Sequence, residues 1–423
     1  MAYTETKSVG LFSRLGSSFR GIGVGIVLII AGTCLLWWNE GNFVATQDAL
    51  NEAQGVTQEL GDVNTLNTSL NGKLVHATGP ANTTDVLRDP IFNISTTAIR
   101  LSRTVEFYQW VENSHSETRQ KLGGGEETVT TYTYEQKWVN RPVNSSSFRD
   151  PVAVRNNANT ILMTLENTAI QATNVSFGAY RLPDSLIGSI SGATSLEAVL
   201  PEETLAALNR QLTAPAAPST QTADEEDPWQ AAFGLSGAGT GSSTSASMVH
   251  TSGNTVYLGQ TPATPRVGDV RVTFREVRPA TVSIIAKLNG STFESYRASN
   301  GKTISMLQMG ETSLDNMYGD SHSSNSTMTW ILRVVGIFLI IIGLKMIVAP
   351  LQVIASVIPF LGNIVGAGTG IVCTLLGLAW SLVVIAIAWL RFRPLVACIA
   401  IIIAIAFAVL LYLRGRSRNA AKA

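Results

Sequence analysis

Residues 20–41 read RGIGVGIVLIIAGTCLLWWNEG. The eighteen residues from Gly21 to Trp38 carry no charge. As a helix rising about 1.5 Å per residue they span roughly 27 Å, close to the thickness of the hydrocarbon layer of a bilayer. Because that layer offers no water to the backbone, a single apolar segment must satisfy its hydrogen bonds as a helix. Residues 21–38 are therefore predicted to form a first transmembrane helix.

Basic and aromatic residues mark the ends of the apolar runs. An indole ring at the headgroup level keeps its N–H in water, and a basic side chain reaches the phosphates. The predicted membrane-interface anchors are Arg20, Trp37, Trp38, Trp330 and Trp389. A cleaved signal peptide is the alternative for the first run. It is disfavoured because the bulky tryptophan pair lies where a cleavage site needs small residues.

The first twenty residues are predicted to be a cytoplasmic leader. Leu11, Phe12, Leu15 and Phe19 recur at helical spacing beside arginines, which indicates a short interfacial helix on the anionic leaflet. A disordered basic leader is the alternative for residues 1–20.

The composition supports a membrane protein without a nucleic-acid partner. The chain has 423 residues, of which 45% are hydrophobic and 14% charged, and its formal net charge is zero. This balance is more apolar than in ordinary globular proteins. A neutral chain has no overall basic field to attract nucleic acid. Its three cysteines, Cys34, Cys373 and Cys398, all fall in apolar runs, so no disulfide framework is expected.

Residues 39–329 are polar and are predicted to form one β-rich extracytoplasmic or lumenal domain in two parts. The first part is 39–212 and the second is 256–329. Between them, residues 213–255 are rich in Ala, Pro, Ser, Thr and Gly and contain an acidic cluster at 224–227. Such a composition buries too little apolar surface to offset the entropy of ordering, so a flexible insertion is expected.

Alternating residues predict the strands of this domain. Ile99, Leu101, Val105 and Phe107 alternate with polar residues, which is typical of a half-buried strand. Residues 127–140 form a second expected strand, and the three glycines at 123–125 predict a hairpin turn between the two. Residues 270–275 and 281–288 show similar patterns.

The C-terminal quarter is again apolar. Transmembrane helices are predicted at 330–348, 364–390 and 395–413, with an interfacial or re-entrant segment at 349–363 and a basic cytoplasmic tail at 414–423. Arg333 lies near one end of its helix and is expected to snorkel to the headgroups. Lys and Arg placement favours a cytoplasmic N-terminus, although Arg391 and Arg393 then lie on the disfavoured side.

The predicted fold class is therefore an α+β membrane protein. It has four transmembrane helices, one N-terminal and three C-terminal, and a large β-rich extramembrane domain. The body is expected on the opposite side of the bilayer from both ends of the chain.

Several stretches resemble the LUMA family, also called the transmembrane protein 43 family. The most distinctive is the run LSRTVEFYQWVE at 101–112. Further matching stretches lie at 14–16, 36–41, 74–76, 87–90, 132–134, 268–272, 282–286 and 389–394. The similarity covers most of the chain and is weakest from about residue 190 to 255.

The resemblance implies a four-span membrane protein with a large lumenal or extracytoplasmic domain. Animal members are similar in placement to residents of the endoplasmic reticulum and inner nuclear membrane, where the family is regarded as a self-associating organiser of membrane protein complexes. A bacterial relative would lie in the cell membrane. The family has no agreed catalytic residues, so the resemblance transfers none.

The residues themselves carry no catalytic motif. The four histidines lack metal-ligand spacing, and neither a P-loop nor a nucleophile elbow is present. We therefore predict no catalytic, cofactor-binding or metal site. Small residues four apart allow close helix contacts in lipid, either within one chain or between copies. The candidates for helix packing or oligomerisation are Gly21, Gly25, Gly362, Gly366 and Gly370.

Three functional hypotheses follow. The preferred one is a non-enzymatic scaffold that binds the lipid bilayer, itself as a homo-oligomer, and other membrane proteins through its large domain. The second is a channel or transporter subunit, for which Asn363 and Thr369 are the polar candidates within the apolar segments. The third is a membrane-bound hydrolase, which the missing motifs disfavour.

Overall fold

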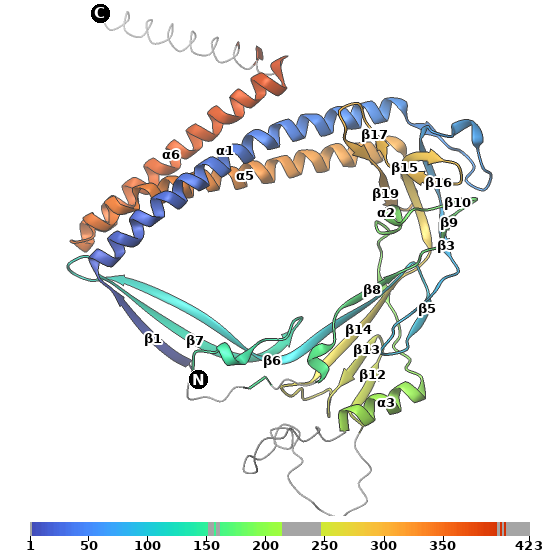
Figure 1. Ribbon diagram of the computed structural model, residues 1–423, viewed down its shortest axis with the longest axis horizontal. Helices are drawn as coiled ribbons and strands as arrows, with labels where there is room; N and C mark the ends of the chain where they lie inside the picture. Colours follow the sequence, from blue (N-terminus) through green and yellow to red (C-terminus); the bar gives the residue numbers. More distant parts are fainter. Residues whose placement is uncertain are drawn as a thin grey trace, which may run out of the picture.

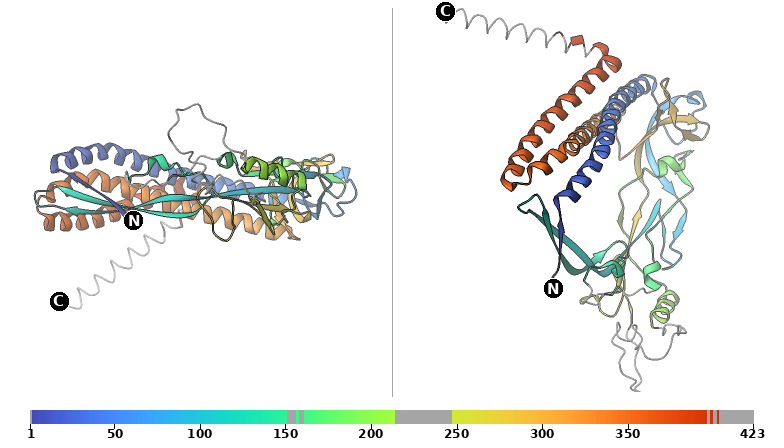
Figure 2. Two further views of the ribbon diagram at one scale, coloured as in Figure 1. Left: turned by 90° about the horizontal axis from the view of Figure 1, so that it is seen from below. Right: turned by 60° about the vertical axis from the view of Figure 1, so that its left-hand side comes forward.

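The computed structural model describes residues 2–150, 156–157, 161–213, 247–395, 398–399 and 402. Its three parts are a group of long helices, a β-rich body at one end of the helices, and a narrow sheet that runs back from the body to the other end (Figure 1). Seen from below, these parts form a flat arrangement (Figure 2).

Three helices in the described part of the chain are long and apolar enough to cross a bilayer. They are α1 (Leu11–Val56), α5 (Leu314–Ala355) and α6 (Pro359–Phe392). The crossings expected at 21–38, 330–348 and 364–390 each fall within one of them. The fourth, at 395–413, lies almost wholly outside the described residues, as does the tail at 414–423.

The segment 349–363 differs from its expected form. Helix α5 continues through Pro350 as far as Ala355, and α6 begins at Pro359 after a short turn. No separate interfacial helix exists there. A proline removes one backbone hydrogen bond, but neighbouring helices compensate for this in a bilayer, so Pro350 does not end the helix.

The larger sheet of the body has eight strands among the described residues. Its main path is β1 (Ala2–Val9), β7 (Glu126–Val139), β6 (Arg100–Gln120), β14 (Val270–Val277), β13 (Thr255–Leu258) and β12 (Val249–Ser252). Two short strands, β11 (Thr194–Ser195) and β8 (Thr168–Gln171), pair with β14 and β6. The hairpin expected around residues 123–125 is confirmed by the β6–β7 pairing.

The second sheet has seven strands. Their order is β19 (Met306–Met309), β15 (Ala280–Asn289), β16 (Thr292–Glu294), β10 (Tyr180–Arg181), β9 (Val175–Phe177), β3 (Leu74–Thr83) and β2 (Gln58–Glu59), with β15 also paired to β3. The remaining elements are the pairs β4 (Val86–Arg88) with β5 (Ser95–Thr97) and β17 (Tyr296–Arg297) with β18 (Thr303–Ile304), the helices α2 (Asp184–Ile187) and α3 (Glu202–Thr213), and the 3-10 turns at Thr68–Leu70, Ser145–Ser147 and Ile161–Thr164.

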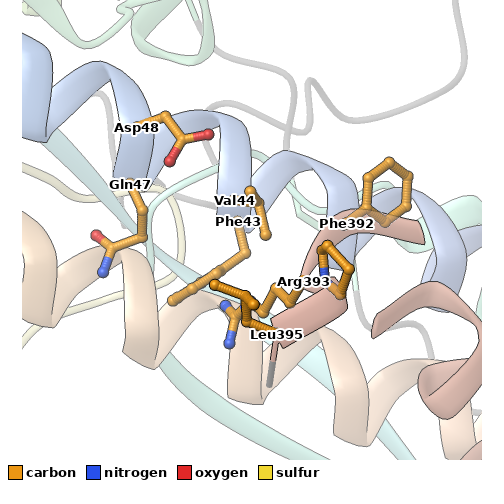
Figure 3. A pocket seen from close by; sticks show the side chains of 8 residues that line it. Phe43, Val44, Gln47, Asp48, Phe392, Arg393 and Leu395 are labelled. Atoms are coloured by element: carbon orange, nitrogen blue, oxygen red, sulfur yellow. The ribbon is translucent and has the colours of Figure 1, made fainter. Parts of the chain in front are cut away.

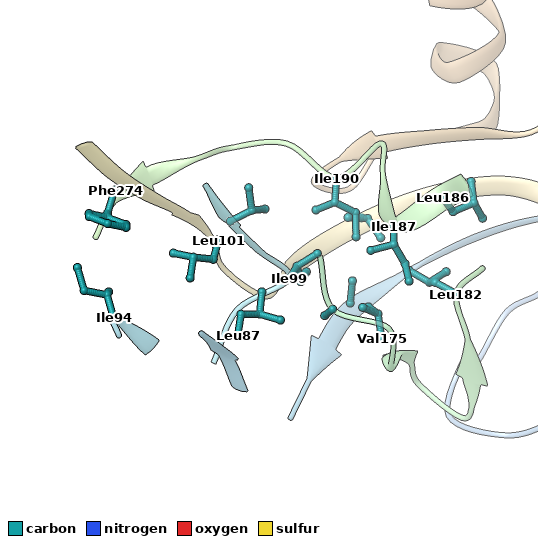
Figure 4. Close-up of a cluster of buried hydrophobic side chains, with 14 of the residues drawn as sticks. Leu87, Ile94, Ile99, Leu101, Val175, Leu182, Leu186, Ile187, Ile190 and Phe274 are labelled. Carbon is teal, nitrogen blue, oxygen red and sulfur yellow. The ribbon is translucent and has the colours of Figure 1, made fainter. Parts of the chain in front are cut away.

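One apolar core joins the two sheets (Figure 4). The predicted inward positions of β6 are confirmed, since Leu101, Val105 and Phe107 are all buried. Phe274 of β14 packs edge-on against Phe92, with 5.5 Å between ring centroids. Because apolar burial is the main stabilising term in folding, this core lets the body fold without disulfides.

Two segments are more ordered than their composition predicted. Residues 247–255, expected to belong to the flexible insertion, include β12 and the start of β13, while 214–246 lie outside the described residues. Residues 2–9, expected to be part of a leader, form the edge strand β1 on β7. The expected interfacial helix is simply the first turns of α1, which continues without a break into the apolar run.

Helices α1 and α5 continue beyond their apolar runs and dock onto the body. Leu50 and Ala53 of α1 pack with Met317 and Tyr318 of α5 and with Ile285 of β15 in a second apolar cluster. The body is thus fixed directly to the helices.

Glu52 adds a polar contact to this docking. Its carboxylate accepts hydrogen bonds from the Ser299 hydroxyl, from the Tyr296 hydroxyl at 2.8 Å and from the Ser299 backbone N–H at 3.0 Å. These bonds favour the charged form and lower the pKa of Glu52, the Ser299 hydroxyl contributing most. The contribution of Glu52 to stability is therefore fully present above its unfolded pKa and is lost as the pH falls through its lower folded pKa.

We expect Glu52→Gln to flatten the acid side of the stability curve. In the unchanged protein, Tm measured in detergent should fall between about pH 5 and pH 3, partly through Glu52. The variant should have a lower Tm at pH 7 and a smaller difference between pH 7 and pH 3. Parallel curves for the two proteins would contradict the assignment.

Candidate functional site

Helices α1 and α5 meet along a seam of four glycines. A Cβ atom built on Gly25 would lie 2.6 Å from the carbonyl oxygen of Gly343, and one on Gly32 would lie 2.8 Å from that of Gly336. Only glycine permits such close backbone approach. Gly21 lies on the same seam, with Met346 3.7 Å away. The candidates Gly21 and Gly25 therefore make contacts within one chain.

The three candidate glycines of α6 are placed differently. A Cβ on Gly362 would lie 2.7 Å from Cα of Ser356, in the turn between α5 and α6. Among the described residues, nothing lies within 4 Å of the Cβ position of Gly366 or Gly370. These two glycines leave an open strip on α6.

A buried ion pair joins the helices just beyond the apolar run of α1. The guanidinium of Arg333 donates to both carboxylate oxygens of Glu40, at 2.6 and 2.8 Å, and Trp389 Nε1 donates to the same carboxylate at 2.9 Å. Glu40 is 0% exposed and Arg333 8%. One residue from each of α1, α5 and α6 thus forms a single cluster, in which Arg333 also lies 4.8 Å from the centroid of the Trp330 ring.

Arg333 does not snorkel, which corrects the expectation for this residue. Arg333 lies near the end of an apolar run, so its local sequence suggested a side chain that reaches the headgroups. Its partner Glu40 is 293 positions away and leaves no signal in that local sequence. The signal that could have found the pair is the charged residue directly after Trp38-Asn39. Of the expected anchors, Trp37, Trp38 and Trp330 are exposed, and Trp37 also packs edge-on against Phe392. Arg20 is exposed near the other end of the apolar run.

Next to this cluster is an open pocket of about 480 Å³. Gln47 and Asp48 project from α1, and Arg393, which follows α6, lies close to Phe43 (Figure 3). The guanidinium carbon of Arg393 is 4.1 Å from the centroid of the Phe43 ring. Its Nη2 is buried and has no hydrogen-bond partner in the described part of the chain. Val44, Phe392, Pro394 and Leu395 complete the lining.

At the opposite end of the helices, the tip of the β6–β7 hairpin is held against α1 and the α5–α6 turn. Arg14 donates to the carbonyl of Gly124 at 2.6 Å, to Ser356 Oγ at 3.1 Å and to Glu126 at 3.2 Å. The backbone N–H of Gly123 bonds the carbonyl of Val357. The hairpin therefore extends past the full apolar length of the helices.

We name residues 2–9, 113–120 and 126–133 the polar ribbon. They form three strands in continuous register from the body to the tip. Each strand of the ribbon has eight residues and is therefore about 27 Å long, which is also the length of the apolar run of α1. The side chains are largely polar and include the charged residues Glu5, Lys7, Glu117, Arg119, Glu126 and Glu127. Within the described residues, β1 and the far half of β6 have unpaired outer edges.

No catalytic or metal-binding arrangement emerges from the described residues, in which no group of three or more His, Cys, Asp or Glu side chains is placed to hold a metal ion. His76 instead lies between Glu59, at 2.8 Å, and the carbonyl of Thr312, at 2.9 Å. Thr369, one of the two polar residues noted for a pore, bonds Gln352 at 2.6 Å between α5 and α6.

Comparison with known proteins decides the family. The profile of the transmembrane protein 43 family matches residues 107–394, more than half of the chain. The chain belongs to the transmembrane protein 43 family. Transmembrane protein 43 of Mus musculus is 25% identical over 413 residues, covering 94% of this chain and 92% of the mouse protein. That of Homo sapiens is 25% identical over 397 residues, covering 91% and 88%.

The transmembrane protein 43 homolog of Drosophila melanogaster is similar to the same extent, at 25% identity over 388 residues, covering 89% of this chain and 90% of the fly protein. No solved structure matches the chain. The resemblance drawn from the motifs is thereby confirmed. Together with the three apolar helices, membership of the transmembrane protein 43 family identifies an integral membrane protein.

Proposed function

We propose that this protein is a self-associating membrane scaffold. Its helices surround the polar ribbons of several copies, and its β-rich bodies bind other membrane proteins. The observation that supports the proposal is the ribbon, which passes from the body to the first turns of α1. If α1 crosses the bilayer, the ribbon also lies at the level of the bilayer core.

Hydrocarbon is a poor environment for the ribbon. A charged side chain at the centre of a bilayer costs about 2.5–3.5 kcal/mol on insertion scales, and each unpaired backbone group at an open strand edge costs several kcal/mol more. Because the ribbon has charges and two open edges, it needs water or protein around it. The helices of a single copy lie on one side of the ribbon only (Figure 1), whereas several copies can enclose it.

The test combines stoichiometry with accessibility. We expect the full-length protein in mild detergent to have a protein mass of at least twice that of the 45.2 kDa chain. In a variant lacking the three native cysteines, a cysteine at Ser116 or Thr118 of the ribbon should react with a water-soluble maleimide in vesicles. A matched cysteine at Phe338, which is 59% exposed on the apolar part of α5, should not react.

A strictly monomeric mass would contradict self-association. If the cysteines of Ser116→Cys and Thr118→Cys reacted with the maleimide as slowly as that of Phe338→Cys, the proposed aqueous environment of the ribbon would be contradicted. Cross-linking of the cysteine-free variant in native membranes, followed by mass spectrometry, identifies the other membrane proteins that the body binds.

The same ribbon favours a second candidate, a channel subunit. A water-filled space lined by polar strands at the level of the bilayer core provides a route for ions. Purified protein in liposomes tests this directly. Ion flux that requires the ribbon residues supports a channel, whereas tight liposomes containing oligomeric protein favour the scaffold alone.

A further inference from the structure

Arg393 lies just after α6, where the apolar runs of the helices end, and forms no ion pair with any carboxylate that the structure describes. The nearby carboxylate of Glu40 is already bonded by Arg333 and Trp389. Arg393 forms no ion pair with Asp48, and its Nη2 is buried without a hydrogen bond in the described part of the chain. A buried donor left unsatisfied is destabilising, and more so when it is charged. The site is therefore incomplete as it stands.

The pocket beside Arg393 has the position and shape for an anionic group. Phe43 supports the face of the guanidinium at 4.1 Å and fixes its orientation. The pocket adjoins the edge-on pair of Trp37 and Phe392, which marks the aqueous end of the apolar runs. A guanidinium prefers phosphate oxygens, which it binds through two parallel N–H donors.

The rest of the lining is arranged for a zwitterion. Leu395, which is 80% exposed, and Phe392 give the pocket an apolar side toward the bilayer. Asp48 lies on the other side, five residues beyond Phe43 along α1 and so about 7.5 Å further from the bilayer. A phosphate at Arg393 would thus have apolar surface below it and a carboxylate above it.

We propose that this pocket binds the headgroup of an amine-bearing zwitterionic phospholipid. Its phosphate accepts from Arg393, its ammonium faces Asp48, and its acyl chains continue along Phe392 and Leu395. This assignment gives a role to an arginine on the side of the membrane where positive charges are disfavoured. It does not depend on self-association, so a monomeric protein would leave it standing.

The experiment measures lipid binding to delipidated full-length protein in detergent by native mass spectrometry. Phosphatidylethanolamine should bind, whereas diacylglycerol, which lacks the phosphate, and inorganic phosphate, which lacks the chains, should bind at least tenfold more weakly. Arg393→Gln should weaken phosphatidylethanolamine binding at least tenfold. Arg391→Gln, an exposed arginine two residues earlier, is the matched control and should bind as the unchanged protein does.

A second variant tests the ammonium end. Asp48→Asn should reduce the preference for phosphatidylethanolamine over phosphatidylglycerol without abolishing phospholipid binding. Because Arg393→Gln could impair folding, Tm of the unchanged protein gives an independent measure, and it should rise with phosphatidylethanolamine but not with diacylglycerol. Equal binding by Arg393→Gln, equal binding of diacylglycerol, or tight binding of inorganic phosphate alone would overturn the proposal.

Discussion

Arg333→Met is expected to lower the free energy of unfolding by about 3–5 kcal/mol, the usual cost of removing one partner from a buried ion pair. The variant leaves the Glu40 carboxylate, which is 0% exposed, without its two guanidinium bonds. Of the bonds to Glu40 within the described residues, the single one from Trp389 remains. Because the cluster joins α1, α5 and α6, we expect the loss to loosen the helices together. Equilibrium unfolding in mixed detergent micelles, followed by tryptophan fluorescence, measures it.

Two controls separate this effect from a general loss of charge. Glu40→Gln combined with Arg333→Met removes both charges and should recover much of the stability, since replacing both members of a buried pair is often nearly neutral. Lys287→Met breaks the half-exposed pair with Glu294 and should cost about 1 kcal/mol or less. A loss below about 1 kcal/mol for Arg333→Met would mean that the cluster does not hold the helices.

Arg103→Met is the second large expected effect, again about 3–5 kcal/mol. Arg103 donates to both oxygens of Asp89, at 2.9 and 2.7 Å, and the two side chains are 5% and 1% exposed. It also bonds the carbonyl of Glu166. Removing it leaves a buried carboxylate that keeps only the backbone donors of Ile91 and Phe92. Guanidinium denaturation followed by circular dichroism of the β-rich body reports the change.

The matched control is on the neighbouring strand. Arg271→Met breaks a bidentate pair with Glu106 between β14 and β6, at 2.5 and 3.0 Å, but both side chains are about one-third exposed. We expect it to cost less than half as much. Equal losses for Arg103→Met and Arg271→Met would show that burial of the Arg103 pair adds nothing.

Local pattern was enough to predict several elements. The alternation at Leu101, Val105 and Phe107 identified β6, and length with apolar composition identified three helices. These features depend on residues close together in the chain, whose periodicity reports the environment directly.

The elements that were missed depend on distant partners. Residues 2–9 are polar, and only their pairing with β7, more than a hundred positions later, makes them a strand. Glu40 and Arg333 each suggest a solvated charge when considered alone. At the candidate site, Arg393 was predicted to lie on the side of the membrane that disfavours positive charge. The pocket beside it could not be predicted, because it forms only where α1 approaches the end of α6.

The unbroken course of α1 has a mechanical consequence. Its 46 residues form a rod roughly 69 Å long, with one end in the lipid and the other wedged in the body. Bilayers of different thickness are matched by different tilts of such rods. Tilting this rod by 10° from the bilayer normal moves its far end sideways by roughly 12 Å and lowers it by only about 1 Å, since it has no internal joint to absorb the motion. A change of tilt therefore carries the body sideways over the lipid surface and leaves its height almost unchanged.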